Sequence, residues 1–148
     1  PVRQQGAAFH RGNLMDFGTA VGRYFSNYFN FQDRARRAEY WWPVFMQLIA
    51  YLAMLALSSL FAMLGDIGVM LIWIPIVLYW LFGLACFIPS LAVAVRRLHD
   101  KDMSGWWILI GLVPLIGALL LLFFFATEGT PGPNKYGPNP KSPTPDVF

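Results

Sequence analysis

Hydrophobic and polar residues form long blocks along this 148-residue chain. No charged side chain occurs in residues 40–65, 67–95 or 103–127. A helix needs about 20 apolar residues to cross the ~30 Å hydrocarbon core of a bilayer, and each block is longer than that. A helix at the surface of a soluble protein needs a polar face toward water, which these blocks lack. The pattern therefore predicts an all-α integral membrane protein.

The block lengths predict three transmembrane helices within a membrane domain of residues 40–127, at about 41–64, 69–95 and 106–125. The tight turn at Gly65–Gly68 makes the first two an antiparallel hairpin. A short polar loop beginning at Arg96 connects the second and third spans, and the Ser104 hydroxyl is expected to cap the third helix.

Residues 14–39 are expected to form an amphipathic interfacial helix followed by a basic segment. Apolar residues recur there at spacings of three and four, with Asn13 as a plausible N-cap. The helix is too short and too polar to span, so its aromatic face lies either in the membrane interface or against a partner protein. The candidate docking residues are Phe17, Val21, Tyr24, Phe25 and Tyr28, together with Tyr136 in the tail.

The two ends of the chain lack helical periodicity. Residues 1–13 are interpreted as an irregular arm. Residues 128–148 contain Pro and Gly too densely for regular structure.

The distribution of basic residues predicts the orientation. With the N-terminus inside, nine Lys and Arg residues precede or lie between the spans on the inner side, and Lys135 and Lys141 remain outside. Cytoplasmic loops carry the excess of Lys and Arg. The N-terminus and the loop after Arg96 are therefore expected in the cytoplasm, and the C-terminus on the opposite side of the membrane, which in a bacterial inner membrane is the periplasm.

The stretch RRLHDKDMSGWW (Arg96 to Trp107) is the most polar part of the membrane domain. It shares its predicted depth with RARRAEYWW, so we expect Glu39 to pair with Arg96 or Arg97, and Asp100 with Arg36 or Arg37. Trp41, Trp42, Trp106 and Trp107 are predicted interface anchors. The full cluster of ion pairs and headgroup contacts comprises Arg34, Arg36, Arg37, Glu39, Arg96, Arg97, His99 and Asp100.

Candidate chemistry in the chain is sparse. His99 and Asp100 could act as a base and its orienting acid, but adjacent helical residues point in different directions. The sequence lacks the common nucleophile, zinc-protease and phosphate-loop motifs. Three imidazole or thiol ligands for a metal cannot be gathered from His10, Cys86 and His99. We therefore predict no catalytic residue, no metal and no cofactor, and a net charge of +3 gives no sign of nucleic-acid binding.

Three blocks of the sequence, in order, support a resemblance to a known family. NFQDRARRAEYWW, RRLHDKDMSGWWILIGLVPLIG and EGTPGPNKYGPNP resemble the bacterial inner-membrane family called domain of unknown function 805. The resemblance covers about residues 20–140. It implies a small three-span inner-membrane protein and carries no established activity or catalytic residue.

Three functions remain open. The leading hypothesis is a non-catalytic accessory or stabilising subunit of a larger respiratory or photosynthetic membrane complex, whose partners are other integral membrane subunits. The second is binding or transport of a lipid or small amphiphile, with anionic lipid attracted by the arginines; orientation alone also explains a basic belt of this kind. The third is an enzyme using His99 and Asp100.

Overall fold

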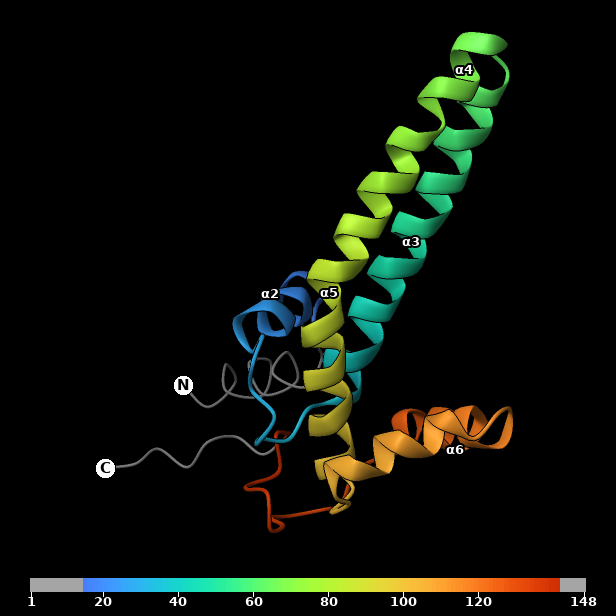
Figure 1. Cartoon of the computed structure of the whole chain (residues 1–148). Helices are drawn as coiled ribbons and strands as arrows, with labels where there is room; N and C mark the ends of the chain where they lie inside the picture. Colours follow the sequence, from blue (N-terminus) through green and yellow to red (C-terminus); the bar gives the residue numbers. More distant parts are fainter. Residues whose placement is uncertain (1–14, 142–148) are drawn as a thin grey trace, which may run out of the picture.

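The computed structural model describes residues 15–141, and its regular elements are helices (Figure 1). The predicted arm of residues 1–13 and the end of the tail lie outside the described residues. In chain order the elements are α2 (Phe17–Ser26), α3 (Arg37–Ala62), α4 (Asp66–Leu71), α5 (Trp73–His99), the 3-10 helix η1 (Gly105–Leu112) and α6 (Ile116–Ala126).

A long antiparallel hairpin of α3 and α5 dominates the molecule, with α4 at its tip (Figure 1). Two helical stretches, Arg37–Ala62 and Asp66–His99, are long and apolar enough to cross a membrane. Only 6% and 11% of their most apolar stretches are buried inside the molecule, so neither is the core helix of a soluble fold. This hairpin agrees with the first two predicted spans.

Helix α5 continues beyond the predicted end of the second span. Arg96–His99 form its last turn, and Asp100 is its C-cap. The prediction of a loop beginning at Arg96 is therefore wrong by one helical turn. Cations suit the last turn of a helix because the free carbonyl groups there carry partial negative charge.

Helix α2 lies across the lower part of the hairpin, against α3 and α5. Its N-cap is Asp16, not Asn13, since the Asp16 carboxylate accepts a hydrogen bond of 2.7 Å from the backbone N–H of Thr19. This bond also lowers the pKa of Asp16. Ala20 and Tyr24 form the buried face of α2.

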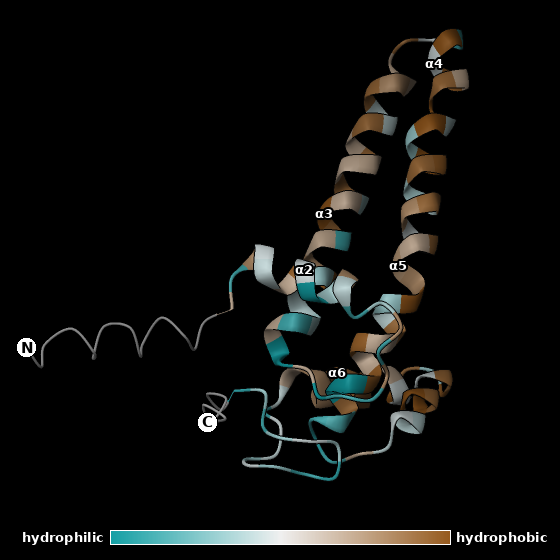
Figure 2. Cartoon of the chain, turned by 90° about the vertical axis from the view of Figure 1, so that its left-hand side faces the viewer, coloured by the Kyte–Doolittle hydropathy of each residue, from teal (hydrophilic) through white to brown (hydrophobic). Residues whose placement is uncertain are grey.

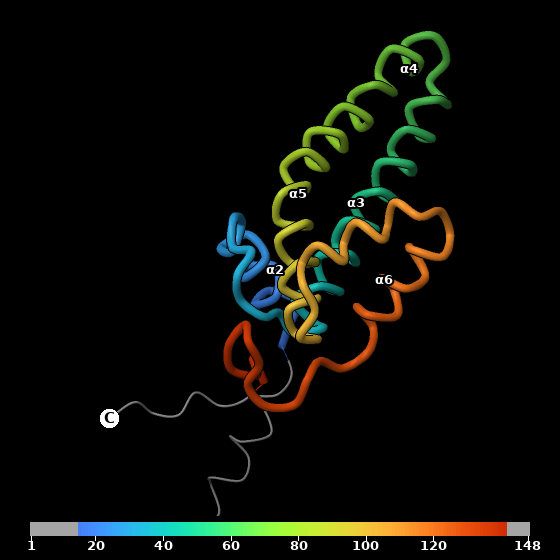
Figure 3. Tube along the Cα trace, turned by 60° about the horizontal axis from the view of Figure 1, so that its bottom comes forward, coloured from blue at the N-terminus to red at the C-terminus, as the bar shows by residue number. Residues whose placement is uncertain are grey.

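The third apolar block is not a single helix, contrary to the prediction of one helix over residues 106–125. The chain forms η1, reverses at Val113–Leu115 and returns as α6, packed against η1 (Figure 3). Leu115 has a φ of 64°. A Cβ on Gly117 would lie 1.7 Å from the Ile110 carbonyl oxygen, so the two arms touch at a position where only glycine fits.

Because the third block turns back, both of its ends lie at the same end of the α3–α5 hairpin. Residues 127–141 run beside residues 34–36 there, with Arg34 bonded to the Gly132 carbonyl and Arg36 to the Pro140 carbonyl. The tail therefore lies beside the loop after α5, whereas the prediction placed the two on opposite sides of the membrane. Hydrophilic residues gather at this end, and the rest of the hairpin is hydrophobic (Figure 2). We call it the charged end.

Candidate functional site

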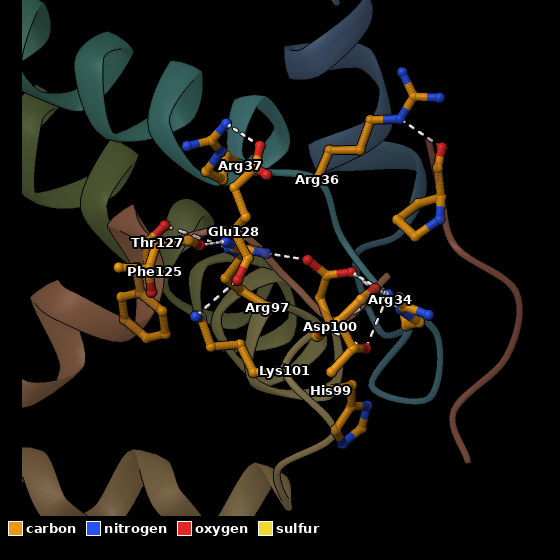
Figure 4. A network of polar contacts seen from close by, with 12 residues as sticks. Arg34, Arg36, Arg37, Arg97, His99, Asp100, Lys101, Phe125, Thr127 and Glu128 are labelled. Atoms are coloured by element: carbon orange, nitrogen blue, oxygen red, sulfur yellow. Dashed lines mark hydrogen bonds and ion pairs between the residues drawn. The ribbon is translucent and has the colours of Figure 1, made fainter. Parts of the chain in front are cut away.

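The three motif blocks of the sequence meet around Asp100, at the charged end (Figure 4). One Asp100 carboxylate oxygen accepts from Nε of Arg34 at 3.0 Å, and the other accepts from Nη1 of Arg97. The side chains of Asp100, Arg34 and Arg97 are 7%, 2% and 0% exposed. A buried carboxylate thus pairs with two buried guanidinium groups, which meets the requirement that buried charges have a partner.

Arg34 connects this ion-pair cluster to the tail. Its guanidinium donates to the carbonyl oxygens of Thr130 at 2.8 Å, of Gly132 at 2.7 Å and of Gly137 at 3.3 Å. The fixed fork of the guanidinium suits several acceptors at once. One arginine therefore orders a Pro/Gly-rich segment that forms no helix.

The tail also packs directly on the end of α5. The backbone N–H of Thr130 donates to the Asp100 carbonyl at 2.8 Å, and the Asn134 side chain donates to the His99 carbonyl at 2.9 Å. These bonds satisfy carbonyl groups that a helix end leaves free. A Cβ on Gly129 would lie 1.9 Å from the Asp100 carboxylate, so the tail passes too close for any side chain there.

Arg97 holds the end of α6 to α5. It donates to the carbonyl oxygens of Phe125, at 3.3 Å, and of Thr127. Trp41 donates to the same Phe125 carbonyl at 3.2 Å. The last turn of α6 is thereby fixed to both long helices.

A second buried ion pair links α2, α3 and α5. The Glu39 carboxylate accepts from Arg96 at 3.3 Å and from Arg23 at 3.3 Å. The structure thus contains the predicted Glu39–Arg96 pair. Within the described residues, Nε and Nη2 of Arg96 are buried without a hydrogen-bond partner.

Arg36 and Arg37 do not pair with Asp100, contrary to expectation. Arg37 pairs with Glu128 at 2.7 Å and Arg36 donates to the Pro140 carbonyl at 2.6 Å, both in the tail. Lys141 also contacts Glu128, at 2.9 Å, and this hydrogen bond and the charges of Lys141 and Arg37 lower the pKa of Glu128. Arg34 makes the ion pair with Asp100 that was expected of Arg36 or Arg37.

These contacts change the interpretation of the basic belt. Arg34, Arg96 and Arg97 are buried and engaged within the chain, so they are not available to lipid headgroups. Arg37 is partly exposed, with its side chain 43% accessible. The arginines of the sequence motifs mainly hold the charged end together.

The His99 ring points away from the Asp100 carboxylate (Figure 4). Its ring stacks on Tyr136 with centroids 3.7 Å apart. Its Nδ1 lies 3.1 Å from the Gln32 carbonyl oxygen and 3.3 Å from that of Asp33. A carbonyl oxygen only accepts, so Nδ1 carries the hydrogen, and Nε2 is left as an acceptor.

Beside His99 is a cavity of about 520 Å³, which we call the His99 cavity. Its walls come from the loop before α3, the end of α5, the start of η1 and the tail. They consist of Phe31, Val95, His99, Trp106, Ile108 and Tyr136, with Ser104 and Gly105. The wall is mainly aromatic and aliphatic, as in many small-molecule sites.

The predicted tryptophan anchors all lie at the charged end, but they differ in exposure. Trp41 and Trp42 donate to the carbonyl oxygens of Phe125 and Met15, both at 3.2 Å. Trp106 is 78% exposed and Trp107 47% exposed. Ser104 caps η1 as predicted, accepting from the Trp106 N–H at 3.4 Å.

Several predicted docking residues contact the chain itself. The Tyr24 hydroxyl lies 2.9 Å from the Cys86 carbonyl and 2.7 Å from Ser90 Oγ. Tyr28 donates to the Ala85 carbonyl at 2.8 Å. Phe17 packs edge-on against Trp42, while Phe25 is 40% exposed and Val21 half-buried.

Sequence reasoning missed the residues contributed by the tail and by α2. Arg23, Glu128, Gly129, Thr130 and Asn134 all contact members of the expected cluster. The signal for these residues is the block EGTPGPN, whose turn-forming residues indicate irregular structure without specifying its contacts. In the described residues, no three His, Cys, Asp or Glu side chains are grouped to hold a metal ion.

The fold and the charged end define a helical membrane protein. The model of the family described as "Protein of unknown function (DUF805)" matches residues 28–138, and the chain belongs to this family. It is 46% identical over 115 residues to "Inner membrane protein YhaI" of Escherichia coli (strain K12), covering 78% of this chain and 89% of that protein.

A second relative from the same strain is "Inner membrane protein YhaH". It is 40% identical over 119 residues, covering 78% of this chain and 90% of that protein. No solved structure matches the chain.

Proposed function

We propose that this chain is a non-catalytic inner-membrane protein that binds a small amphiphile in the His99 cavity. The observation that carries the proposal is the cavity itself, whose volume of about 520 Å³ suits a small molecule. Its aromatic and aliphatic wall accommodates an apolar body. Its few polar atoms can form hydrogen bonds with one small polar group of the ligand.

Two polar atoms at the cavity remain unused in residues 15–141. No hydrogen bond involves Nε2 of His99 or the hydroxyl of Tyr136 among these residues. Nε2 would lie 3.5 Å from a Cβ on Gly105, which also lines the cavity. A ligand hydroxyl or amine donating to Nε2 would satisfy the imidazole that the Gln32 and Asp33 carbonyl groups orient.

The position of the cavity favours a ligand taken from the membrane. Trp106 and Ile108 begin the long apolar stretch of η1 and α6, whereas His99 and Tyr136 belong to the charged end. A molecule in the cavity therefore contacts both apolar and polar surroundings. This is the environment of a lipid or amphiphile at a bilayer interface.

The separation of His99 from Asp100 supports a binding role over catalysis. Asp100 is occupied by Arg34 and Arg97 on its side of α5, and His99 faces the cavity on the other. An acid–base pair must reach a common substrate. These two side chains do not share one cavity.

We propose that the charged end lies in the cytoplasm. All nine Lys and Arg residues of the described part are at this end, in α2, in residues 34–37, at the end of α5 or in the tail. The charged residue at the α4 tip is Asp66, which is acidic. The positive-inside bias therefore favours a cytoplasmic position for residues 127–141 as well as for residues 34–36.

A second candidate function is the accessory subunit expected from the sequence. An open apolar groove of about 290 Å³ between α3 and α5, lined in part by Ala50, Ala53 and Tyr79, favours it because another membrane helix fits such a surface. The internal use of Tyr24 and Tyr28 removes much of the surface first assigned to docking. Gentle extraction and native gel analysis test it: fixed-stoichiometry migration with a larger complex supports it, and a lone monomer rejects it.

Native mass spectrometry tests the amphiphile proposal. The protein is extracted from its own membranes in mild detergent, and any species bound one to one is identified by mass. Phe31→Ala removes a wall of the cavity, and Phe29→Ala is the matched control, since Phe29 is 76% exposed outside it. We expect a bound amphiphile in the wild type and the control and its loss in Phe31→Ala. Equal retention in both variants, or no bound species, contradicts the proposal.

A further inference from the structure

The η1–α6 hairpin (residues 105–126) is an uncharged, mostly exposed surface at the charged end of the molecule. Trp106, Leu112, Leu115 and Ile116 are 78%, 79%, 76% and 63% exposed. A contiguous apolar surface of this kind is unfavourable in water and marks contact with a membrane or another protein. The occupant of this surface must therefore be apolar.

Length decides how far the hairpin can reach. The eight residues of η1 and the eleven of α6 each give an arm of about 16 Å, from rises of about 2.0 and 1.5 Å per residue. The hydrocarbon core of a bilayer is about 30 Å thick. Each arm is about as long as one leaflet of this core is thick, and neither arm is long enough to cross the bilayer.

The reversal between the arms pairs most of its backbone N–H groups within the chain. Pro114 has no N–H group, and the N–H groups of Val113, Ile116 and Gly117 bond to carbonyl groups of the reversal or of η1 at 2.9, 2.7 and 3.0 Å. Unsatisfied backbone groups are very costly in hydrocarbon. The contact at Gly117 keeps the arms together, so little backbone is exposed between them.

Both ends of the hairpin are tied to polar groups at one level. Ser104 caps η1, and the carbonyl groups of Phe125 and Thr127 at the end of α6 are held by Arg97. Glu128 follows immediately and pairs with Arg37. Both ends of the hairpin are thus held at the polar end of the molecule, and the α6 end is held there by charged groups.

We propose that the η1–α6 hairpin is a re-entrant element inserted into the acyl chains of a single leaflet, the one that meets the charged end. The chain then crosses the bilayer twice, through α3 and α5. This inference is independent of a ligand in the His99 cavity, which has its own test.

Single-cysteine variants test the arrangement in a Cys86→Ala background, the native cysteine being buried. Ile67→Cys reports the tip at α4, and Lys135→Cys reports the tail. An impermeant maleimide is added to cells with a permeabilised outer membrane or to inverted inner-membrane vesicles. We expect Ile67→Cys to react only in cells and Lys135→Cys only in inverted vesicles. Reaction of both variants in the same preparation would overturn the proposal, because the tip and the tail would then lie on one side and the third block would cross.

Depth is measured on full-length protein carrying a nitroxide at Leu115→Cys, in phosphatidylethanolamine–phosphatidylglycerol vesicles. Relaxation by dissolved oxygen with little relaxation by a water-soluble nickel complex places the hairpin tip in acyl chains. Strong relaxation by nickel, or by neither agent because protein covers the tip, rejects the proposal. If Leu115→Cys does not fold, Leu112→Cys provides an equally exposed position on η1.

Discussion

At the charged end of the α3–α5 hairpin the buried side chains include arginines and carboxylates, whereas at its α4 tip large apolar side chains are exposed. Arg34, Arg96 and Arg97 are buried, and Met63 and Met70 are 81% and 80% exposed. Lipid solvates an apolar side chain without any specific partner. A charged group near lipid must find its partner within the protein.

Because of this difference, the positions that require a particular residue are concentrated at the charged end. An exposed side chain at the α4 tip needs only to be apolar, so many sequences satisfy it. The exception is Gly68, where a Cβ would lie 1.8 Å from the Phe61 carbonyl oxygen. Residues at the charged end must match a particular partner in geometry and charge. We therefore expect substitutions to cost most at the charged end, in the order of the predictions below.

The largest expected effect comes from Asp100→Asn, which leaves Arg34 and Arg97 buried beside a neutral side chain. Breaking one partner of a buried ion pair costs about 3–5 kcal/mol. We expect a loss of that size in the free energy of unfolding, measured by titration with a denaturing detergent.

Asp102→Asn is the matched control. Asp102 is exposed, has a φ of 60° that asparagine tolerates, and makes no ion pair among the described residues. We expect a change within about 0.5 kcal/mol. A similar loss in both variants would show that the Asp100 pairs do not stabilise the charged end.

Gly129→Ala tests the docking of the tail. The added Cβ would lie 1.9 Å from the Asp100 carboxylate and 2.7 Å from its carbonyl oxygen, so the tail must move away. Overpacking of this kind costs about 1–3 kcal/mol. We expect a lower unfolding free energy and faster proteolysis of residues 127–141.

The control for this change is Gly22→Ala in α2. No atom lies within 4 Å of a Cβ there, and alanine is the better helix former. A gain of about 0.5–1 kcal/mol is expected. Unchanged protection of the tail in Gly129→Ala would contradict the close contact with Asp100.

The difference between the two ends also explains what could be predicted from sequence. Block length and absence of charge predicted α3 and α5 because a spanning helix depends on composition and length. The same criterion did not predict the break in residues 106–125, since a helical hairpin and a single long helix are equally apolar. The reversal depends on Pro114 and on the contact of Gly117 with η1, which hydrophobicity does not report.

At the charged end, the expected depth of each segment in the membrane predicted which segments meet, but it did not predict every ion pair between them. The Glu39–Arg96 pair was expected because both residues flank adjacent spans. The tail follows the η1–α6 hairpin back to this end, where Pro140 accepts from Arg36 and Glu128 pairs with Arg37. Arg34 is therefore the arginine that pairs with Asp100. Once the third block was assigned as a span, the tail could not be placed there.

A smaller effect is expected for Tyr24→Phe, where uncharged hydrogen bonds join α2 to α5. The hydroxyl contacts the Cys86 carbonyl and Ser90 at 2.9 and 2.7 Å. Loss of a typical hydrogen bond costs about 0.5–1.5 kcal/mol. The control is Tyr51→Phe, because Tyr51 stacks near Tyr79 and its hydroxyl makes no hydrogen bond among the described residues. Equal unfolding free energies for the two variants would rule out a contribution from the Tyr24 hydroxyl.

The smallest effect is expected at Glu128, whose exposed carboxylate contacts Lys141 and Arg37. The pKa of Glu128 in the folded protein is lowered, chiefly by the hydrogen bond and charge of Lys141. Its contribution to stability is therefore complete above the ordinary glutamate pKa of about 4.3 and is lost as the pH falls through the lower folded-state pKa. Solvent screening keeps such exposed pairs weak.

The measurement is the thermal unfolding midpoint of the wild type and Glu128→Gln between neutral and acidic pH. We expect the wild type to unfold at a slightly higher temperature at neutral pH, and the difference to vanish once Glu128 is protonated in the folded protein. A difference that grows on acidification would reverse the sign and exclude a stabilising contact with Lys141 and Arg37. A difference as large as that of Asp100→Asn would contradict the contrast between exposed and buried pairs, because both ion pairs lie at the same end and differ mainly in burial.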